Sequence, residues 1–396
     1  MLIFTILLLN TPRNIKAAQT VVYIFLLIAL TWRLPLSPMI RWNMTKLMIW
    51  VSVVCLSGYI VFMVNMWVGL FVLLALVTTY YPIPTQYSGE TMLMVILGAV
   101  LYIVFYEVYN KPVMLALLCL FAMANIITVV VQYLNMDFQL TVNQNTGKAY
   151  WDIRQGLMDC RNSLSAALAF CLPAAFFEKW KISIRWVMVV AILIGLILAK
   201  SVGGILASMP TLFYYADKWF SNMMPKYISL CLVVSLAICG GLVFIAYVDS
   251  PGYSGRWAAW RMYGNLKAET WTRGVGLGHW KVVFNRKDIM GEICKAARCN
   301  DPVKGLYYAQ AHNEVIQADF EMGHAAIVLI VGFLVGVLRR IRNLQDPTCI
   351  LILVAIVIDS MVFFPFHIPI LAIVIIMSLS MMERDLRVRR NEVQQG

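Results

Sequence analysis

Apolar runs separated by short polar breaks repeat along almost the whole chain. A helix that crosses a lipid bilayer needs about 20 mainly apolar residues, and many of these runs approach that length. The runs cover residues 17–32, 46–64, 66–80, 92–109, 112–133, 162–177, 184–199, 202–215, 227–248, 324–338, 348–361 and 367–382. The pattern predicts an all-α integral membrane protein with about 12 transmembrane helices.

Lys and Arg side chains are concentrated in four of the polar segments. These are residues 178–185, 216–226, 339–343 and the C-terminal tail, 383–396. Basic residues favour the cytoplasmic side of a membrane. Even numbers of predicted spans separate the four segments, so one orientation satisfies them all. The basic residues between positions 33 and 46 fall on the opposite side and are the one disagreement.

This orientation divides the chain into four parts. Residues 1–248 form about nine transmembrane helices, with a segment near 135–161 on the far side of the membrane. Residues 249–323 form one large, mostly helical loop on that side, 324–382 hold the last three helices, and 383–396 form a basic cytoplasmic tail. Because a long polar insert between spans is seldom an idle linker, the large loop is the first candidate for function.

Composition narrows the class of protein. Hydrophobic residues occupy 61% of the 396 positions and charged residues 13%, with a mean hydropathy of +0.77, whereas soluble domains carry about 25% charged residues. An ordinary soluble enzyme, a disordered chain and a nucleic-acid-binding domain are therefore excluded. The net charge of +12 is explained mainly by basic cytoplasmic loops, and attraction of anionic lipid-linked substrates is the other interpretation.

The informative part of the large loop opens with S-G-R-W-A-A-W-R, which begins at Ser254. Ser254 is expected to cap a helix that starts one or two residues later. Residues four apart share a helix face, so Arg256 lies with Trp260. Trp257 and Arg261 share the neighbouring face. Such a helix either anchors in the lipid headgroup region or presents a guanidinium that binds phosphate.

Two further features of the loop favour structural roles. The glycines of Gly274–Gly278 lack the spacing and the preceding strand of a dinucleotide-binding fingerprint, so they predict a tight turn. Cys294 and Cys299 lie in a compartment that permits disulfides and form a possible disulfide pair. No Cys or Cys/His cluster has the spacing of a zinc site, so no metal site is predicted.

The loop ends with A-H-N-E-V-I-Q-A-D-F-E-M-G, residues 311–323, which predicts a helix that enters the membrane from the far side. His312 lies near the first turn of this helix. Asn313, Gln317 and Glu321 line an adjacent stripe. A histidine with several polar neighbours at a membrane surface favours a functional role.

The other three histidines carry no comparable pattern. His367 follows Asp359 within an aromatic, Pro-rich turn, F-F-P-F-H-I-P, which is more typical of a packed hairpin than of a site. His279 and His324 are isolated and are expected to be structural. These four residues are therefore outside the predicted catalytic site.

Taken together, the motifs resemble one protein family. S-G-R-x-x-x-W from Ser254, G-V-G-x-G, and H-N-E-x-x-Q-x-x-x-E-x-G from His312 lie in one loop after the ninth predicted span. R-Q-G from Arg154 and R-N-S-L from Arg161 precede them. In this order the motifs resemble the O-antigen ligase and O-antigen polymerase superfamily of bacterial polytopic membrane glycosyltransferases, over roughly residues 150–325.

The resemblance implies a metal-independent glycosyltransferase of the bacterial inner membrane, with the large loop in the periplasm. The donor would be an undecaprenyl-diphosphate-linked glycan. The acceptor would be lipid A–core, for a ligase of lipopolysaccharide biosynthesis, or a growing glycan, for a surface-polysaccharide polymerase. No cofactor is implied, because the lipid diphosphate already activates the sugar. Arg256 would neutralise the diphosphate leaving group, and His312 would deprotonate or orient the acceptor hydroxyl.

One position departs from the family pattern. Members often carry Ser-Arg-Gly at the start of a mid-chain span, whereas this chain has K-S-V-G-G from Lys200, with Val202 in the Arg position. Lys200, Arg154 or Arg161 would then supply the second cation for the diphosphate, or activity is altered or lost. An ammonium group is not equivalent to a planar guanidinium, and all three side chains also have structural interpretations. The residues expected to support the site are Trp260, Asn313, Glu314 and Glu321.

Three other functions stay open at this level. A protein O-oligosaccharyltransferase of the same superfamily would use the same donor and a protein hydroxyl. A transporter would place polar groups near the midplane of several spans, which are few in this sequence, and would not need the large loop. A non-catalytic scaffold would tolerate the loss of His312, whereas an enzyme would not.

Overall fold

The computed structural model describes most of the chain from position 64 onward. The described residues are 57, 60, 64–79, 86–134, 139–142, 149–152, 157–158, 160–220, 251–270, 273–296, 310–340 and 346–395. Within them the fold is helical, with thirteen α-helices, one short 3-10 helix and one two-stranded hairpin.

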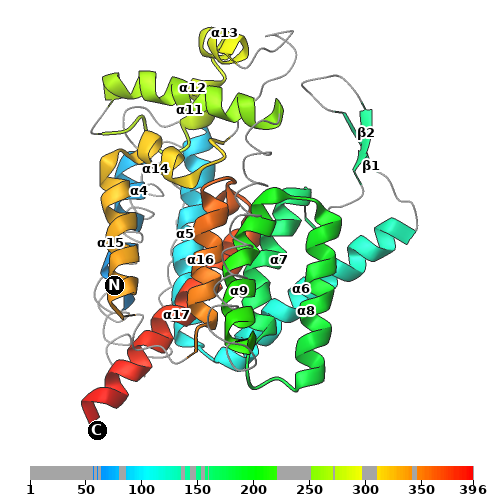
Figure 1. The fold of residues 1–396 in the computed structure, drawn as a ribbon. Helices are drawn as coiled ribbons and strands as arrows, with labels where there is room; N and C mark the ends of the chain where they lie inside the picture. Colours follow the sequence, from blue (N-terminus) through cyan, green and yellow to red (C-terminus); the bar gives the residue numbers. More distant parts are fainter. Residues whose placement is uncertain are drawn as a thin grey trace, which may run out of the picture.

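The helices form a bundle and a smaller group that lies across one end of it (Figure 1). The bundle consists of α4 (Met66–Thr79), α5 (Gln86–Glu107), α6 (Lys111–Leu134), α7 (Arg161–Ala175), α8 (Ile182–Ala199), α9 (Val202–Phe220), α15 (His324–Arg340), α16 (Thr348–Ser360) and α17 (Pro369–Gln395). The end group consists of α11 (Pro251–Thr270), α12 (Trp280–Phe284), α13 (Lys287–Ala296) and α14 (Glu314–Met322). The remaining elements are the strands β1 (Gln139–Val142) and β2 (Ala149–Asp152) and the 3-10 helix η3 (Pro365–His367).

Nine predicted apolar runs coincide with bundle helices, α4 to α9 and α15 to α17. The runs 17–32 and 227–248, and most of 46–64, lie outside the described residues. Among the described residues, three helices are long and apolar enough to cross a membrane, which indicates a membrane protein. They contain the segments Glu90–Glu107, Lys111–Gln132 and Ile182–Ala199. The total of about 12 spans stays a prediction.

Apolar side chains on the outside of α8 fit a lipid environment. Ile184, Val187, Ile194 and Ile197 are all exposed on the surface of the bundle. Exposed apolar area is unfavourable in water, at about 25 cal/mol per Å². The same area is favourable against lipid tails, so the exposure of α8 is the expected property of a helix at the rim of a membrane bundle.

α7 forms the centre of the bundle. Its side chains are buried without exception from Ser163 to Ala175, and it packs against α6, α8, α9 and α16. Small residues allow helices in membranes to approach closely. At Gly204 of α9 an added Cβ would lie only 1.8 Å from Oγ of Ser165. The close approach fixes the first turn of α9 against α7.

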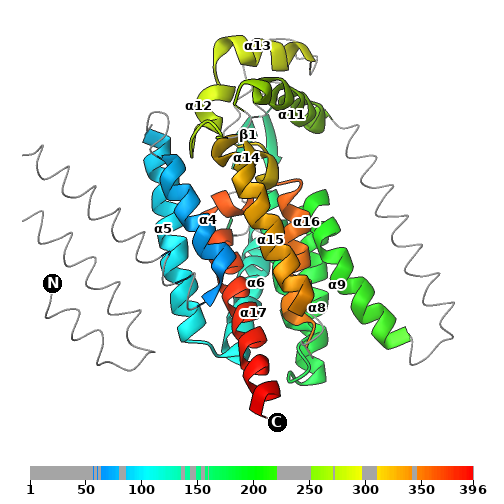
Figure 2. The same ribbon diagram turned by 90° about the vertical axis from the view of Figure 1, so that its left-hand side faces the viewer.

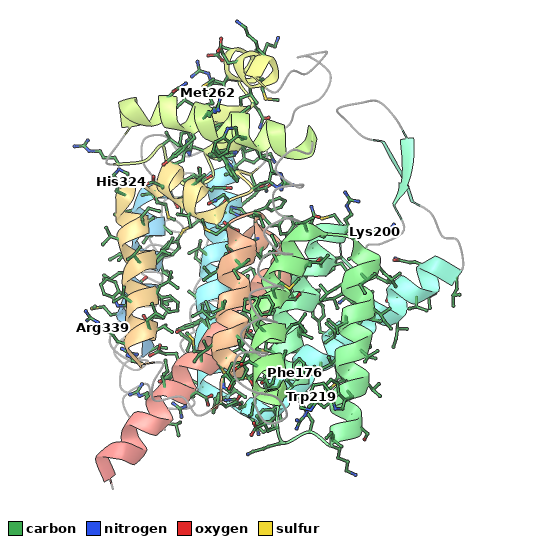
Figure 3. All side chains as sticks on the ribbon, in the orientation of Figure 1. Phe176, Lys200, Trp219, Met262, His324 and Arg339 are labelled. Atoms are coloured by element: carbon green, nitrogen blue, oxygen red, sulfur yellow. The ribbon has the colours of Figure 1, made fainter. Side chains whose placement is uncertain are left out.

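The bundle has two chemically different ends (Figure 3). Phe176, Trp219 and Arg339 lie at one end, and Lys200 and His324 lie at the other. The described parts of the four basic segments fall at the first end, because three of them lie at or after the ends of α7, α9 and α15, and the fourth is the end of α17. The helices α11 to α14 cover the opposite end (Figure 2). One orientation in a membrane would therefore satisfy all four basic segments, as the sequence predicts.

The described part of the large loop is a helical layer with its own core. Trp280 stacks on Phe284 with 3.7 Å between the ring centroids. Phe320 of α14 meets both rings edge-on, at 5.3 Å from each. These aromatic contacts join α12 to α14. The predicted helical character of the loop is confirmed for its described residues.

Two predicted helix boundaries are wrong. α11 begins at Pro251, so Ser254 lies inside the helix and is not its N-cap. Proline suits the first turn of a helix, because the N–H that it lacks would have no partner in the helix. The predicted helix over 311–323 does not continue into the membrane span. It ends at Met322, and Gly323, with φ of 76°, separates α14 from α15.

The described part of the segment near 135–161 departs from the expected all-helical fold. β1 and β2 pair in an antiparallel hairpin, with Gln139 opposite Asp152 and Val142 opposite Ala149. Alternate residues in a strand point to opposite sides, and apolar and polar residues are mixed here. A short strand has no helical period to detect, which is why the apolar pattern did not predict the hairpin.

Candidate functional site

The H-N-E segment begins α14 through a side-chain cap. Oδ1 of Asn313 accepts a hydrogen bond from the backbone N–H of Ile316 at 3.0 Å, which satisfies one free donor of the first turn. Nδ2 of Asn313 donates to the carbonyl of Met361 at 3.0 Å. Asn313 therefore ties the start of α14 to the turn between α16 and α17, residues 361–368, which we call the corner.

α11 places two predicted site residues against the same region. The indole N–H of Trp260 donates to the carbonyl of Ala311 at 2.7 Å. Nη1 of Arg256 donates to the carbonyl of Val362 at 3.1 Å. The first bond holds the residue before His312, and the second brings the guanidinium to the corner. The S-G-R-x-x-x-W motif on α11 and the H-N-E motif at the start of α14, which lie near opposite ends of the large loop, thus meet at the corner.

The other face of α11 is turned outward. Trp257 is 48% exposed, and the guanidinium carbon of Arg261 lies 5.7 Å from the centroid of its ring, in the range of a cation–π contact. Arg256 and Trp260 are less exposed and bond toward the corner. The predicted division of the helix into two Trp–Arg faces is confirmed.

His312 combines backbone strain with an unsatisfied atom. Its φ is +53°, a left-handed conformation that costs an L-residue about 1–2 kcal/mol. Its ring meets Phe364 edge-on, with 4.7 Å between the centroids. Nδ1 is buried and has no hydrogen-bond partner among the described residues. A buried polar atom without a partner needs an explanation, and a partner atom on a bound substrate is one.

The electrostatics keep His312 neutral. Burial lowers the pKa of His312 well below its usual range, and the positive charge of Arg256 lowers it further. The imidazole is therefore uncharged near pH 7 and has a lone pair that accepts a proton. An anion bound to Arg256 would offset that positive charge and raise the pKa of His312. Anion binding and the basicity of the imidazole are thus coupled.

The corner holds a histidine that sequence reasoning left out. Nδ1 of His367 lies 3.3 Å from Oε1 and 3.2 Å from Oε2 of Glu314. Nε2 of His367 lies 3.0 Å from Nε2 of Gln317. No local pattern connects these residues, because 53 positions separate Glu314 from His367.

Glu321 anchors the glycine turn to α14. Its carboxylate accepts the backbone N–H of Gly278 at 2.9 Å and of Trp280 at 3.1 Å, and the amide of Gln317 at 3.2 Å. Gly274 and Gly278 both have positive φ, so the predicted tight turn is confirmed. Burial raises the pKa of Glu321 despite these hydrogen bonds. The position of Glu321 indicates structural support of the loop.

The segment that departs from the family pattern lies beside the corner. Lys200 ends α8 with a φ of 48°, and its side chain is exposed. A Cβ added at Gly203 would lie 3.3 Å from Oδ1 of Asp359 and 3.3 Å from Cγ2 of Val362. The carbonyl of Val362 also accepts the bond from Arg256. The start of α9 and the guanidinium of Arg256 therefore both lie against Val362.

Asp359 is the second residue outside the predicted site that the structure brings to it. It is 1% exposed, and its Oδ2 has no hydrogen-bond partner among the described residues. Burying a carboxylate without a partner is costly. The position of an acidic residue near the end of an apolar run was visible in the sequence, but its closeness to Gly203 and Val362 was not.

Four predicted residues are not joined to this cluster by the structure. Arg161 begins α7 at the end of the bundle that α11–α14 cover, with its side chain exposed. Arg154 and Cys299 lie outside the described residues, as does the side chain of Cys294, so the possible disulfide stays a prediction. Within the described ranges, no group of three or more His, Cys, Asp or Glu side chains is arranged to hold a metal ion.

Comparison with known proteins assigns no family to the chain. No protein-family model matches it, and no curated protein matches it. The motif resemblance and the geometry of the corner are therefore the grounds on which a function is proposed.

Proposed function

We propose that the chain is a glycosyltransferase of the bacterial inner membrane, with its large loop in the periplasm. It would move a glycan from an undecaprenyl-diphosphate carrier to an acceptor hydroxyl, as an O-antigen ligase or a surface-polysaccharide polymerase. The observation that carries the proposal is the meeting of Arg256 and His312 at the corner. A fixed cation lies near a neutral imidazole whose Nδ1 has no hydrogen-bond partner in the described part of the chain.

Arg256 would act on the donor side of the reaction. A guanidinium binds phosphate oxygens through two parallel N–H bonds and keeps its charge when partly buried. The bond from Nη1 to the carbonyl of Val362 orients the group at the corner. Fixed positive charge in a dry site stabilises the negative charge that develops on a departing diphosphate. Lys200, Arg161 and Arg154 are the further cations proposed for this diphosphate.

His312 would act on the acceptor side. The acceptor oxygen attacks the anomeric carbon and forms the new C–O bond, while the C–O bond to the diphosphate breaks. The electron pair of that bond leaves with the diphosphate, and the hydroxyl proton passes to the imidazole. A neutral His312 is ready for this step. A diphosphate on Arg256 would also raise the pKa of His312, so donor binding would strengthen the base.

The branches of the proposal differ only in the acceptor. A ligase uses lipid A–core, a polymerase uses a growing glycan, and a protein O-oligosaccharyltransferase uses a protein hydroxyl. A transporter or a non-catalytic scaffold is the alternative from another class. Each branch makes a different prediction about which acceptor becomes glycosylated.

The first test is glycan transfer by the purified full-length protein in detergent with EDTA present. The donor is an undecaprenyl-diphosphate glycan, offered with lipid A–core, with excess donor alone, or with an acceptor protein. Transfer to one acceptor is expected. Arg256→Ala and His312→Ala should each lower the rate by about 100-fold or more, the usual effect of removing a charge stabiliser or a general base.

Matched control variants separate this mechanism from damage to the fold. Arg261→Ala removes a guanidinium from the outward face of the same helix, and His324→Gln changes a partly exposed histidine of the same region. Both controls should keep most of the transfer activity. Normal product from Arg256→Ala or His312→Ala would remove the mechanism. Transfer to no acceptor would favour the transporter or scaffold.

A further inference from the structure

We propose that His367 is a positioning residue that holds the H-N-E segment, and through it the imidazole of His312, in the conformation needed for proton transfer. The inference rests on the proposed function and deepens it by adding a residue from a different part of the chain. His367 acts through Glu314 and Gln317, and it is not proposed to touch the reacting atoms.

His367 joins two successive turns of α14. Its Nδ1 contacts the carboxylate of Glu314, and its Nε2 contacts the amide nitrogen of Gln317 at 3.0 Å. An amide nitrogen is a donor, so the neutral tautomer that satisfies both contacts carries its proton on Nδ1 and donates to Glu314. The carboxylate also accepts the backbone N–H of Phe366 at 2.9 Å. The start of α14 is therefore held from the corner by charge-assisted bonds.

The same bonds reach the backbone on both sides of His312. Oε1 of Gln317 accepts the N–H of Ala311 at 3.0 Å, and Asn313 is tied to the corner through Met361. The left-handed φ of His312 is costly and persists only where the surroundings determine it. Fixing both neighbours of His312 supplies that constraint, and His367 holds Gln317 in place.

His367 also belongs to the turn that packs on the His312 ring. The backbone N–H of His367 donates to the carbonyl of Phe364 at 3.1 Å, within the short helix η3. The ring of Phe364 is the edge-on neighbour of His312, at 4.7 Å between centroids. The turn that the His367 side chain ties to Glu314 and Gln317 is therefore the turn that packs on the imidazole of His312.

Carbethoxylation by diethyl pyrocarbonate tests the inference without any substrate. The chain has 4 histidines, so mass spectrometry of peptides measures each imidazole separately. The full-length protein in detergent is labelled, and the rate at His312 is divided by the rate at His324, whose side chain is 39% exposed. His367→Ala should raise this ratio by about tenfold, the change expected when a cluster of charge-assisted hydrogen bonds is lost.

The conservative variant His367→Asn retains a donor near Nδ1 for Glu314 but loses the acceptor at Nε2 for Gln317. Its ratio should therefore lie between those of the wild type and His367→Ala. Glu314→Gln, which keeps the shape and weakens the bond, should lie in the same range. An unchanged ratio in both His367→Ala and Glu314→Gln would overturn the inference. If His367→Ala does not fold, as judged by thermal melting, Glu314→Gln and His367→Asn decide the result.

Kinetics separate positioning from a purely structural role. For glycan transfer, His367→Ala should lower kcat by about tenfold with a KM for the lipid donor within about twofold, because the base is displaced while the donor cation is retained. An equal loss in His367→Asn would contradict positioning by the Nδ1 contact. A wild type that transfers no glycan would overturn the proposed function, whereas the labelling ratios would still decide the role of His367.

Discussion

Two residues that the sequence selected for chemistry are also the two described non-glycine residues with positive φ. Lys200 has φ of 48° and His312 has φ of 53°. A left-handed conformation costs an L-residue about 1–2 kcal/mol. Residues with such strain are enriched at functional sites, where contacts with the surrounding structure stabilise them. Lys200 is the C-cap of α8, where a left-handed residue is common. The strain at His312 has no such explanation and supports the selection of His312 on grounds independent of the motif resemblance.

Lys200→Gly should raise the free energy of unfolding by about 1 kcal/mol, because glycine adopts the left-handed conformation without a steric penalty. Lys200→Ala removes the same charge but keeps the strain, so it should bring no such gain. Thermal melting in detergent measures both. If Lys200 binds the diphosphate, both variants should raise the KM for the lipid donor to a similar extent. A difference in KM between them would argue for a backbone effect instead.

The low pKa of His312 predicts a pH dependence of stability. Because the folded state disfavours the protonated imidazole, the unfolded state takes up a proton first as the pH falls through about 6.5. His312 therefore contributes stability above this pH that is lost below it, by at most about 1.4 kcal/mol per pH unit. His312→Asn, which tolerates positive φ, should lose less stability on acidification than the wild type. Denaturant unfolding at a series of pH values measures the difference, and parallel curves would contradict it.

At the scale of elements, the glycine turn and α14 form one unit. The N–H of Val275 donates to the carbonyl of Phe320 at 2.9 Å, and the N–H of Gly276 donates to the carbonyl of Glu321 at 2.9 Å. The carboxylate of Glu321 in turn accepts a hydrogen bond from the backbone N–H of Gly278. The turn is thus docked along the C-terminal half of the helix that carries the H-N-E segment, and a change in the turn should reach the site through α14.

Gly274→Ala should destabilise the protein by about 2 kcal/mol or more. A Cβ at this position would lie 2.5 Å from the carbonyl oxygen of Glu321, and φ is +69°, so both backbone strain and a clash with backbone oppose it. Gly291→Ala in α13 is the matched control. Nothing lies within 4 Å of its added Cβ, so it should gain about 0.5–1 kcal/mol from helix propensity. Melting temperatures of the two variants should therefore move in opposite directions.

At the scale of the whole molecule, the two ends of the bundle are both fixed by polar contacts. At the end opposite the corner, Glu383 of α17 accepts hydrogen bonds from Asn65 at 2.9 Å and from Arg340 at 3.0 Å. Lys111 of α6 pairs with Asp346 at 3.0 Å and with Asp385 of α17. These pairs hold α17 to its neighbours at one end, while the corner holds it at the other.

The arrangement of charges predicts which end faces the cytoplasm. Two variants each add one cysteine at an exposed position, Lys179→Cys in one and Arg273→Cys in the other. The two added cysteines should react with a membrane-impermeant maleimide from opposite sides of the membrane. The first should be labelled in inverted vesicles, and the second in intact spheroplasts, because basic loops are retained in the cytoplasm. The chain without the new cysteines gives the background. Labelling of both positions from one side would contradict the arrangement.

The helices of the bundle were predictable because a long apolar run has few alternatives in a membrane protein. α5, α6 and α8 follow from hydrophobic length alone. The break at Gly323 was not predictable in the same way. The helical spacing over 311–323 leads directly into the apolar run 324–338, so the local pattern favours one continuous helix. The docking of α14 on α11 and on the corner accompanies the turn of the chain at Gly323.

In the candidate site, too, some features follow from local spacing in the sequence and others from tertiary packing. The sequence by itself determined the helical membrane fold, the two faces of α11 and the stripe of Asn313, Gln317 and Glu321, since all of these depend on local spacing. Only the tertiary structure decided that Arg256 and His312 meet, and that His367 and Asp359 join them. The reason is physical: these contacts link residues far apart along the chain, and long-range contacts depend on how the whole bundle packs rather than on any local pattern.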